Sequence, residues 1–160
     1  MTHLTRILAL SATLFGLVAC ATAPAPAPLA DTLGRDPQLS TFNRLVEQAG
    51  LTEELRAAGP LTVFAPSDEA FKALPAATLD KLSQDKEQLK AILHLHMLAS
   101  KLPAAEVKNS SPKSLQGSAL ALARAGEFVT VEDAVVQRAD ISATNGVAHV
   151  IDRVLLPAKK

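Results

Sequence analysis

The middle of the chain contains the stretch GPLTVFAPSDEAFKALP, Gly59 to Pro75, in which the residue pattern changes half-way. Its first part, Leu61 to Pro66, is a short β-branched and aromatic run bounded by prolines, which is typical of a buried strand. Its second part begins with Ser67 and Asp68, whose side chains can accept hydrogen bonds from the first N–H groups of a helix. The stretch therefore predicts a buried strand that leads directly into a capped helix.

Further helices are predicted on both sides of this stretch. Residues 36–50 carry apolar side chains at helical spacing, with Pro37 suited to the first turn and Gly50 to the C-terminal end. A short helix is predicted over residues 52–59, and a longer one from about Asp85 to Met97.

The C-terminal third favours strands. Residues 114–123 and 127–141 show alternation, with turns expected at Gln116-Gly117, Ala125-Gly126 and Glu132-Asp133, and a last strand over Val147–Leu156. Helices followed by antiparallel hairpins predict an α+β domain.

Residues 1–20 have the layout of an export signal. A single cation, Arg6, precedes an uncharged apolar run that is too short for a comfortable permanent span. The run ends in LVAC, which resembles the bacterial lipobox and predicts a lipoprotein whose mature N-terminus is Cys20, acylated by chains such as palmitate. The alternative is an ordinary signal peptide with a chance cysteine. Each buried methylene contributes about 0.8 kcal/mol to membrane partition, so two or three chains anchor durably.

An alanine-proline alternation follows, over residues 21–31. Because proline favours extended geometry, this segment is expected to be a semi-rigid stalk, or a plain disordered spacer. The domain itself is expected to span residues 32–160. The residue after the cysteine is Ala21 and not an aspartate. In enteric bacteria, the absence of aspartate at this position favours the outer membrane. The domain is therefore expected in the periplasm or on the cell surface.

Composition excludes several classes of protein. The chain has 16 basic and 16 acidic side chains and neither tryptophan nor tyrosine, so it offers no basic stripe or stacking platform for nucleic acid. Its only cysteine is Cys20, which excludes an intramolecular disulfide and any paired-cysteine metal motif.

Three stretches together resemble the fasciclin domain family. GPLTVFAPSDEAFKALP is similar to the first signature of that family, and NGVAHVIDRVLLP, Asn145 to Pro157, is similar to the second. Between them, LKAILHLHMLASKLPAAEV resembles the central helix and the segment that leaves it. The resemblance implies a wedge-shaped β-sandwich of about seven strands flanked by several helices. It also implies non-catalytic work in cell adhesion or protein-protein contact, without a cofactor.

The resemblance also implies a partner-binding region. In animal adhesion members, a Tyr-His pair after the central helix and an Asp-Ile pair before the second signature are proposed receptor elements. Asp140 and Ile141 match the second pair and His96 matches the histidine of the first, but Leu95 stands at the tyrosine position. Leucine offers no phenolic hydrogen bond, so an integrin-type site is not implied.

The alternative to a binding module is a periplasmic enzyme or a small-ligand or metal-binding protein that uses His94, His96 and His149. On a helix, residues two apart point about 200° away from each other, so His94 and His96 share a metal only where the chain is extended. Burial of His96 and His149 in apolar packing would argue against this alternative. Ser67 lacks a glycine-flanked elbow and is expected to cap a helix.

The final strand holds the remaining structural candidates. Alternation places His149 and Asp152 on opposite faces, so they cannot form a local pair. His149 is therefore expected to be a core histidine whose nitrogens find partners in another segment. Asn145-Gly146 is expected to need a positive φ at the entry turn. A hydrogen bond between His96 and the final strand is also expected.

These features together predict a lipid-anchored, extracytoplasmic module that contacts an unknown protein or cell-surface partner. The contact is expected through the region of Asp140 and Ile141 and the exit of the central helix, at Leu95 and His96. Weak self-association of neighbouring tethered domains is a third hypothesis.

Overall fold

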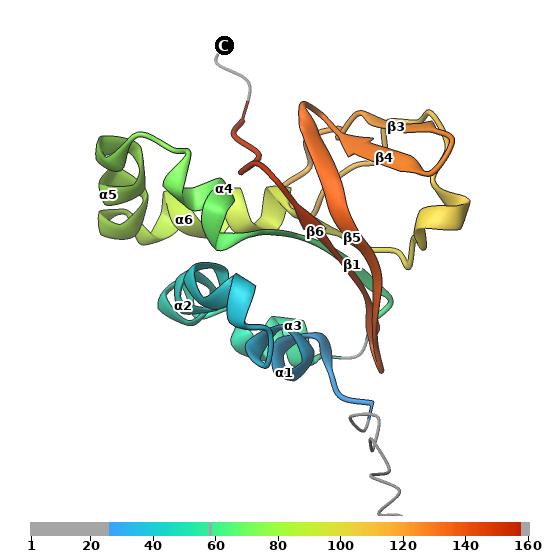
Figure 1. Ribbon diagram of the computed structural model, residues 1–160. Helices are drawn as coiled ribbons and strands as arrows, with labels where there is room; N and C mark the ends of the chain where they lie inside the picture. The colour runs from blue at the N-terminus through green and yellow to red at the C-terminus, as the bar shows by residue number, and fades with distance from the viewer. Residues whose placement is uncertain (1–25, 58, 158–160) are drawn as a thin grey trace, which may run out of the picture.

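A computed structural model describes residues 26–57 and 59–157, and Figure 1 shows their arrangement. The helices are α1 (Leu29–Gly34), α2 (Ser40–Ala49), α3 (Thr52–Arg56), α4 (Asp68–Lys72), α5 (Ala76–Gln84) and α6 (Lys86–Leu95), with 3-10 turns η1 (Pro37–Leu39) and η2 (Ala104–Glu106). The strands are β1 (Leu61–Pro66), β2 (Met97–Leu98), β3 (Leu122–Ala125), β4 (Phe128–Val131), β5 (Ala134–Ala143) and β6 (Gly146–Ile151). No helix of the described part is long and apolar enough to cross a bilayer.

The strands form a six-stranded sheet in the order β2-β1-β6-β5-β4-β3. β1 and β6 are parallel neighbours in unbroken register, from Leu61 opposite Gly146 to Pro66 opposite Ile151. The other pairs are antiparallel. The two signature stretches, far apart in the sequence, therefore lie side by side at the centre of the sheet.

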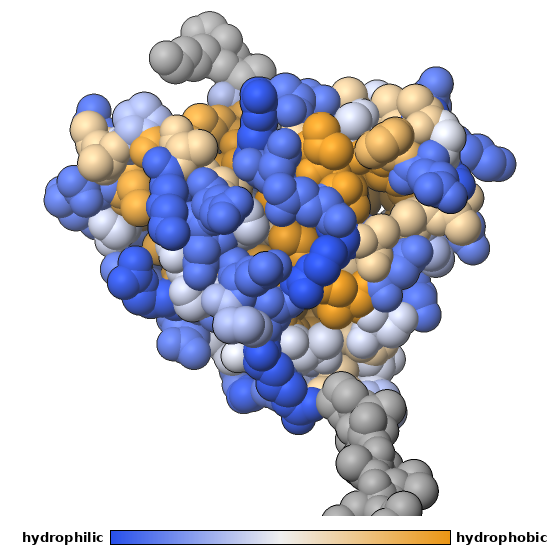
Figure 2. Space-filling model, in the orientation of Figure 1, coloured by the Kyte–Doolittle hydropathy of each residue, from blue (hydrophilic) through white to orange (hydrophobic). Residues whose placement is uncertain are grey.

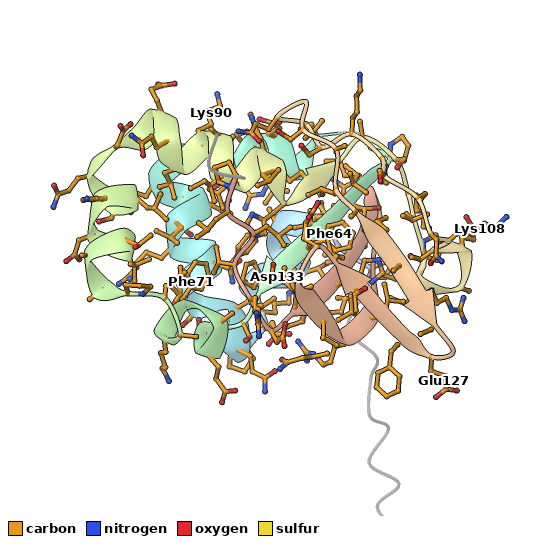
Figure 3. All side chains as sticks on the ribbon, turned by 90° about the horizontal axis from the view of Figure 1, so that it is seen from above. Phe64, Phe71, Lys90, Lys108, Glu127 and Asp133 are labelled. Carbon is orange, nitrogen blue, oxygen red and sulfur yellow. The ribbon has the colours of Figure 1, made fainter. Side chains whose placement is uncertain are left out.

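A hydrophobic cluster lies on each face of the sheet. Val63 of β1 and Val150 of β6 belong to the first cluster, which the helices cover. Phe64 and Ile151, the next residues along these strands, belong to the second. Because side chains alternate along a strand, the two clusters occupy opposite faces. In Figure 3 Phe64 lies deep inside the molecule, and the charged residues Lys90, Lys108 and Glu127 lie at its edges.

The α+β class predicted from the sequence is confirmed, but the described strands form one curled sheet of six, where a sandwich of about seven was expected. β5 explains the curl. This strand has ten residues and pairs with both β6 and β4, with register shifts between Val136 and Arg138 and between Arg138 and Ile141. Such bulges bend a strand and increase its twist, so a single strand can turn the sheet on itself.

Most of the predicted helices are present. η1 and α2 replace the single helix expected over residues 36–50, and Gly50 ends α2 in the left-handed conformation. α3, α4 and α6 are also in their expected places. α1 and α5 were not predicted. α1 begins inside residues 21–31, which were assigned to the stalk, and Leu29 is buried against the domain.

Two strand predictions need correction. Of residues 114–123, only the last two belong to a strand, β3. The final strand ends at Ile151 and does not reach Leu156. The chain bends after Ile151, and the backbone N–H of Leu155 donates to the His96 side chain instead of to a neighbouring strand.

The turn at Asn145-Gly146 does not have the backbone conformation that was predicted. Neither residue has a positive φ. Glycine is required at position 146 because a Cβ there would overlap the carbonyl oxygen of Leu61 on the neighbouring strand. A Cβ at Gly59 would likewise overlap the carbonyl oxygen of Asn145. The two glycines therefore let the β1 and β6 backbones approach at the start of the parallel pair.

Gly146→Ala is expected to lower the free energy of unfolding by about 2–3 kcal/mol, because the added methyl group forces β1 and β6 apart. Gly34→Ala is the matched control, since a Cβ there meets nothing within 4 Å, and its effect should stay within about 0.5 kcal/mol. Denaturation followed by circular dichroism measures both. Equal stabilities of the two variants would contradict the close approach.

Candidate functional site

A network of hydrogen bonds holds the loop that follows β2, residues 99–107, against the sheet. Its sheet side is formed by three side chains, Thr62 of β1, Asp140 of β5 and His149 of β6, which we call the loop clasp. Each of the three contacts the loop backbone at Leu102 or Ala104. The clasp lies where the sequence placed the candidate partner-binding region.

Asp140 sits in the irregular part of β5 with a φ of 58°, in the left-handed region. Its Oδ1 accepts a hydrogen bond from the backbone N–H of Ala104, at 2.8 Å. Its own N–H donates to Nδ1 of His149, at 3.2 Å. Aspartate tolerates this conformation better than most residues. The bulge thus turns Asp140 toward the loop and leaves the residue exposed.

His149 is only 1% exposed and lies stacked on Phe64, with ring centroids 5.5 Å apart. Its Nδ1 accepts from Asp140, so the ring proton is on Nε2, which donates to the carbonyl oxygen of Leu102 at 2.9 Å. Burial lowers the pKa of His149, although the bond to Leu102 and the charge of Asp140 act in the opposite direction. The neutral ring therefore links β5 to the loop through two hydrogen bonds.

Thr62 completes the clasp from the adjacent strand. Its hydroxyl accepts from the N–H of Leu102 at 2.9 Å and donates to the carbonyl oxygen of Ser100. From β3, Arg124 donates to the carbonyl oxygens of Ala104 and Ala105, at 3.1 and 2.7 Å. The loop is thus fixed by side chains from four strands.

His96 has a similar role at the end of α6. Its Nδ1–H donates to the carbonyl oxygen of Ile92 at 2.8 Å, and its Nε2 accepts from the N–H of Leu155 at 2.9 Å. A hydrogen bond was expected between His96 and the final strand, and its observed partner, Leu155, lies just after the end of β6. Burial lowers the pKa of His96 to about 4, although the bond to Ile92 opposes this shift.

The four residues expected to contact a partner are not equally accessible. Asp140 is exposed and Ile141 is half-buried against the first cluster. Leu95 and His96 are only 3% and 1% exposed, and Leu95 belongs to the second cluster. A leucine at this position therefore packs in the core, and a partner cannot reach His96 in this conformation. In the expected partner-binding region, the surface that a partner can reach consists of Asp140, Ile141 and the loop of residues 99–107.

The three histidines proposed for a metal or small-ligand site do not converge. Nε2 of His94 lies 3.2 Å from a carboxylate oxygen of Glu54 on α3, whereas His96 and His149 are bonded as described above. Within residues 26–57 and 59–157, no three His, Cys, Asp or Glu side chains are grouped so that they could hold a metal ion. The arrangement supplies hydrogen bonds that fix backbone segments.

The remaining candidates stabilise the architecture. Ser67 caps α4 by accepting from the N–H of Ala70 at 3.3 Å, and Pro66 ends β1 in the core. Asp68 accepts from the hydroxyl of Ser40 at 2.7 Å and from the N–H of Thr41 at 2.8 Å. Partial burial would raise the pKa of Asp68, but these hydrogen bonds lower it.

Two further candidates link distant segments. Asp152 accepts from the N–H of Val135 at 2.7 Å and so joins the chain after β6 to β5. The Asn145 side chain accepts from the N–H of Leu29 and donates to the carbonyl oxygens of Leu55 and Ala57, at 2.7–2.8 Å. Asn145 therefore joins the β5–β6 turn to α1 and to the end of α3. Cys20 lies outside the described residues.

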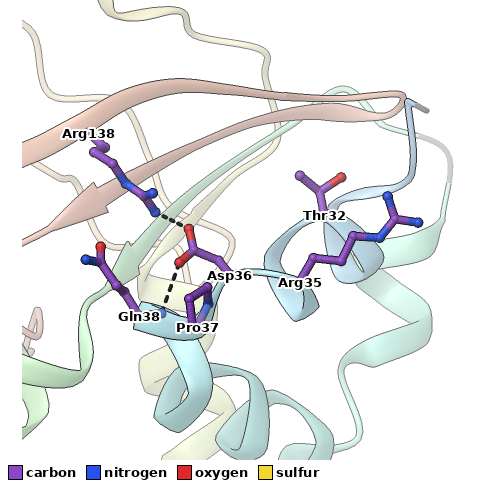
Figure 4. A pocket seen from close by; sticks show the side chains of 6 residues that line it. All are labelled: Thr32, Arg35, Asp36, Pro37, Gln38 and Arg138. Carbon is purple, nitrogen blue, oxygen red and sulfur yellow. Dashed lines mark hydrogen bonds and ion pairs between the residues drawn. The ribbon is translucent and has the colours of Figure 1, made fainter. Parts of the chain in front are cut away.

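A shallow pocket of about 340 Å³ lies between α1, η1 and β5 (Figure 4). Asp36 forms an ion pair with Arg138 across it and also accepts from the N–H of Gln38 at 3.0 Å. The carboxylate thus caps η1 and holds β5 at once. This link was not predicted from the sequence.

Comparison with known proteins identifies the family. The model of the fasciclin domain matches residues 37–157, well over half of the chain. The chain belongs to the fasciclin domain family. This fasciclin domain is 45% identical over 120 residues to the Synechocystis protein sll1483, covering 74% of this chain and 67% of that protein.

Animal proteins carry similar domains. The pig transforming growth factor-beta-induced protein ig-h3 is 42% identical over 131 residues, which cover 79% of this chain but only 19% of ig-h3. Among solved structures, a FAS1 domain pair from the insect cell adhesion molecule Fasciclin I aligns with a TM-score of 0.66 and 18% identity. That alignment covers 82% of this chain and 51% of the insect chain. The fasciclin fold expected from the resemblance is thereby confirmed, with six described strands in place of about seven.

Sequence reasoning missed two members of the site, Thr62 and Arg124. Thr62 was included in an apolar strand, and only its full burial shows that its hydroxyl needs partners. A polar residue inside a continuous apolar run was the available signal. Arg124 carries no such signal, because its acceptors belong to η2, far away in the sequence.

His96→Ala is expected to lower the melting temperature and to reduce the free energy of unfolding by about 2–4 kcal/mol. The substitution leaves a cavity beside α6 and removes the acceptor for the Leu155 N–H. Circular dichroism reports the transition. An unchanged melting temperature would contradict the structural role of His96.

The same variant tests the protonation state. The folded pKa of His96 is about 4, against an ordinary value of 6.5. Between these values the unfolded chain holds a proton that the folded chain lacks, so the free energy of unfolding falls as the pH drops from 6.5 toward 4. One histidine contributes about 1.4 kcal/mol per pH unit. His96→Ala should show a shallower slope, and an identical slope would overturn the assignment.

Asp140→Gly is expected to speed hydrogen exchange at the Ala104 amide by about tenfold, because that N–H loses its acceptor. Glycine keeps the left-handed backbone, so strain does not confuse the result. Asp140→Asn retains an oxygen acceptor and is the matched control. The Leu155 amide, bonded to His96, should exchange at the same rate in both. Equal protection of Ala104 in the two variants would exclude the clasp contact.

Proposed function

We propose that this chain is a lipid-anchored, extracytoplasmic binding module that contacts another macromolecule through the surface of its fasciclin domain and catalyses no reaction. The anchor is an acylated Cys20, and residues between it and α1 hold the domain away from the lipid surface. The partner is a protein or a component of a cell surface.

The observation that carries this proposal is that the buried histidines are hydrogen-bonded to the backbone of the domain itself. His96 and His149, two of the three histidines of the enzymatic alternative, are buried and have both ring nitrogens engaged with backbone groups. The third, His94, lies beside Glu54, away from both. General acid-base catalysis needs a side chain within reach of a substrate proton. The two buried rings are instead neutral supports, which favours a binding function over the enzymatic alternative.

The fold supports an adhesive role. A solved structure that resembles the domain comes from an insect cell adhesion molecule. Around Asp140 and Ile141, the clasp supplies a rigid surface loop, and rigid loops bind with a smaller entropy cost. We therefore place the partner-binding surface at Asp140, Ile141 and residues 99–107.

The sequence before the domain supports the anchor. The apolar run ending in LVAC puts Cys20 at the lipobox position, and an alanine-proline run separates it from α1. Export through a membrane and covalent lipid would place the domain in the periplasm or on the cell surface.

Metabolic labelling with radioactive palmitate is expected to label the wild-type chain and to leave Cys20→Ser unlabelled. The matched control is Thr22→Ser, a neighbouring substitution that keeps Cys20 and should retain the label. Labelling of Cys20→Ser would refute the anchor.

Protease added to intact cells reports the location of the domain. Digestion before lysis indicates the cell surface, and protection until the outer envelope is broken indicates the periplasm. Digestion only after rupture of the inner membrane would refute an extracytoplasmic domain.

A further inference from the structure

A groove of about 790 Å³ opens at the end of the molecule where the C-terminal segment leaves the sheet. It lies between that segment, the loop before β3 and the β4–β5 turn, with Leu95 at the end of α6 also in its lining. Figure 3 looks down on the molecule and shows Asp133, of the β4–β5 turn, between the helices and the β3–β4 hairpin.

The floor of this groove is apolar. Leu95, Leu120 and Leu155 line it and also belong to the second hydrophobic cluster. The wall includes Leu156, whose side chain remains 47% exposed. A ligand side chain placed here would extend the core of the domain and cover Leu156. Removing such apolar surface from water is the main source of binding free energy.

One side of the groove is acidic. Glu132 and Asp133 form the β4–β5 turn, and none of the described residues that line the groove is basic. Glu132 is fixed, because its carboxylate accepts from the N–H of Ala121 at 2.7 Å. The Asp133 side chain is 76% exposed and lies 3.3 Å from Arg153. A weak, exposed ion pair of this kind is readily exchanged for a ligand cation.

We propose that this groove binds a segment of a partner protein that presents an aliphatic or aromatic side chain next to a lysine or arginine. The apolar side chain would lie on the leucine floor, and the cation would face Asp133 and Glu132. The groove falls within the size range of ligand sites, roughly 300–1,000 Å³. Carboxylates at its side select against anionic partners. The groove is a second contact site, separate from the surface at Asp140 and Ile141. This inference rests on the proposed binding function and names the chemistry of the segment that the second site would take.

The face around the β3–β4 hairpin provides a comparison within the same domain. Figure 2 shows hydrophobic side chains gathered over the strands. Phe128 is 71% exposed but does not line the groove. A ligand attracted only by exposed apolar surface would prefer Phe128 to Leu156. This difference makes Phe128 the matched control.

The probe is the peptide acetyl-Lys-Leu-Phe-Lys-amide, with acetyl-Glu-Leu-Phe-Glu-amide as its charge-reversed counterpart. The protein is the chain from Cys20 onward with Cys20→Ser, which contains every described element and both hydrophobic clusters. Titration of nitrogen-15-labelled protein is followed by amide chemical shifts. The basic peptide is expected to shift the amides of residues 116–120, 132–133 and 155–156, and the acidic peptide to leave them unchanged.

Substitutions separate the contribution of apolar contact to peptide binding from that of charge attraction. Leu156→Ala should weaken binding of the basic peptide about tenfold through lost apolar contact. Asp133→Lys should weaken it about fivefold through charge reversal at an exposed position. Phe128→Ala should stay within about twofold of wild type. Both altered groove residues are substantially exposed, so the variants should fold, and an unchanged spectrum elsewhere in the domain checks this.

Shifts centred on the β3–β4 hairpin, equal binding of the acidic peptide, or unchanged affinity of Leu156→Ala would each overturn the groove proposal. These results would leave the proposed function standing, because palmitate labelling and protease access do not depend on the groove. Conversely, an unlabelled Cys20 would remove the anchor and leave peptide binding in the groove unaffected.

Discussion

The parallel pairing of β1 with β6 is the constraint on which the rest of the structure depends. It places two stretches from different parts of the chain at the centre of the sheet, where each contributes side chains to both hydrophobic clusters. Parallel strands buried on both faces need nearly continuous apolar sequence, which both stretches have. The backbones come close enough at Gly59 and Gly146 that a side chain at either position would overlap the neighbouring carbonyl.

Polar side chains then attach the irregular parts of the chain to this central pair. His149 and Thr62 project from the two strands and hold the loop after β2, and Asn145 holds α1 and α3 at the adjoining turn. His96 does the same for the C-terminal segment. Buried polar groups cost free energy unless they are hydrogen-bonded, and every buried side-chain nitrogen and oxygen of the described residues has a partner. These bonds therefore define where each loop runs.

Local sequence patterns predicted these elements: a continuous apolar run predicted β1, and apolar residues at helical spacing predicted α2 and α6. α5 was missed since it buries only Leu82 and carries little apolar pattern. α1 was missed for another reason: Leu29 is held by Asn145, far away in the sequence, within a run that favours extended chain. Contacts of this kind depend on the tertiary fold. The candidate site also has features that the local sequence predicts and features that depend on the tertiary fold. His149 and Asp152 have separate partners, as expected, although Asp152 lies beyond the end of β6. The partners of His149 lie on a bulge and on a loop and could not be predicted.

The central position of β6 has a consequence for the order in which the protein is made. β6, the last described strand, fills the gap between β1 and β5, so the sheet cannot be completed until the chain has emerged as far as Ile151. Contacts between such distant segments form slowly, because a long loop must first close. The sheet of the nascent domain therefore stays incomplete until β6 has been made. For a domain exported as proposed above, this delay would keep the polypeptide competent for translocation until that point.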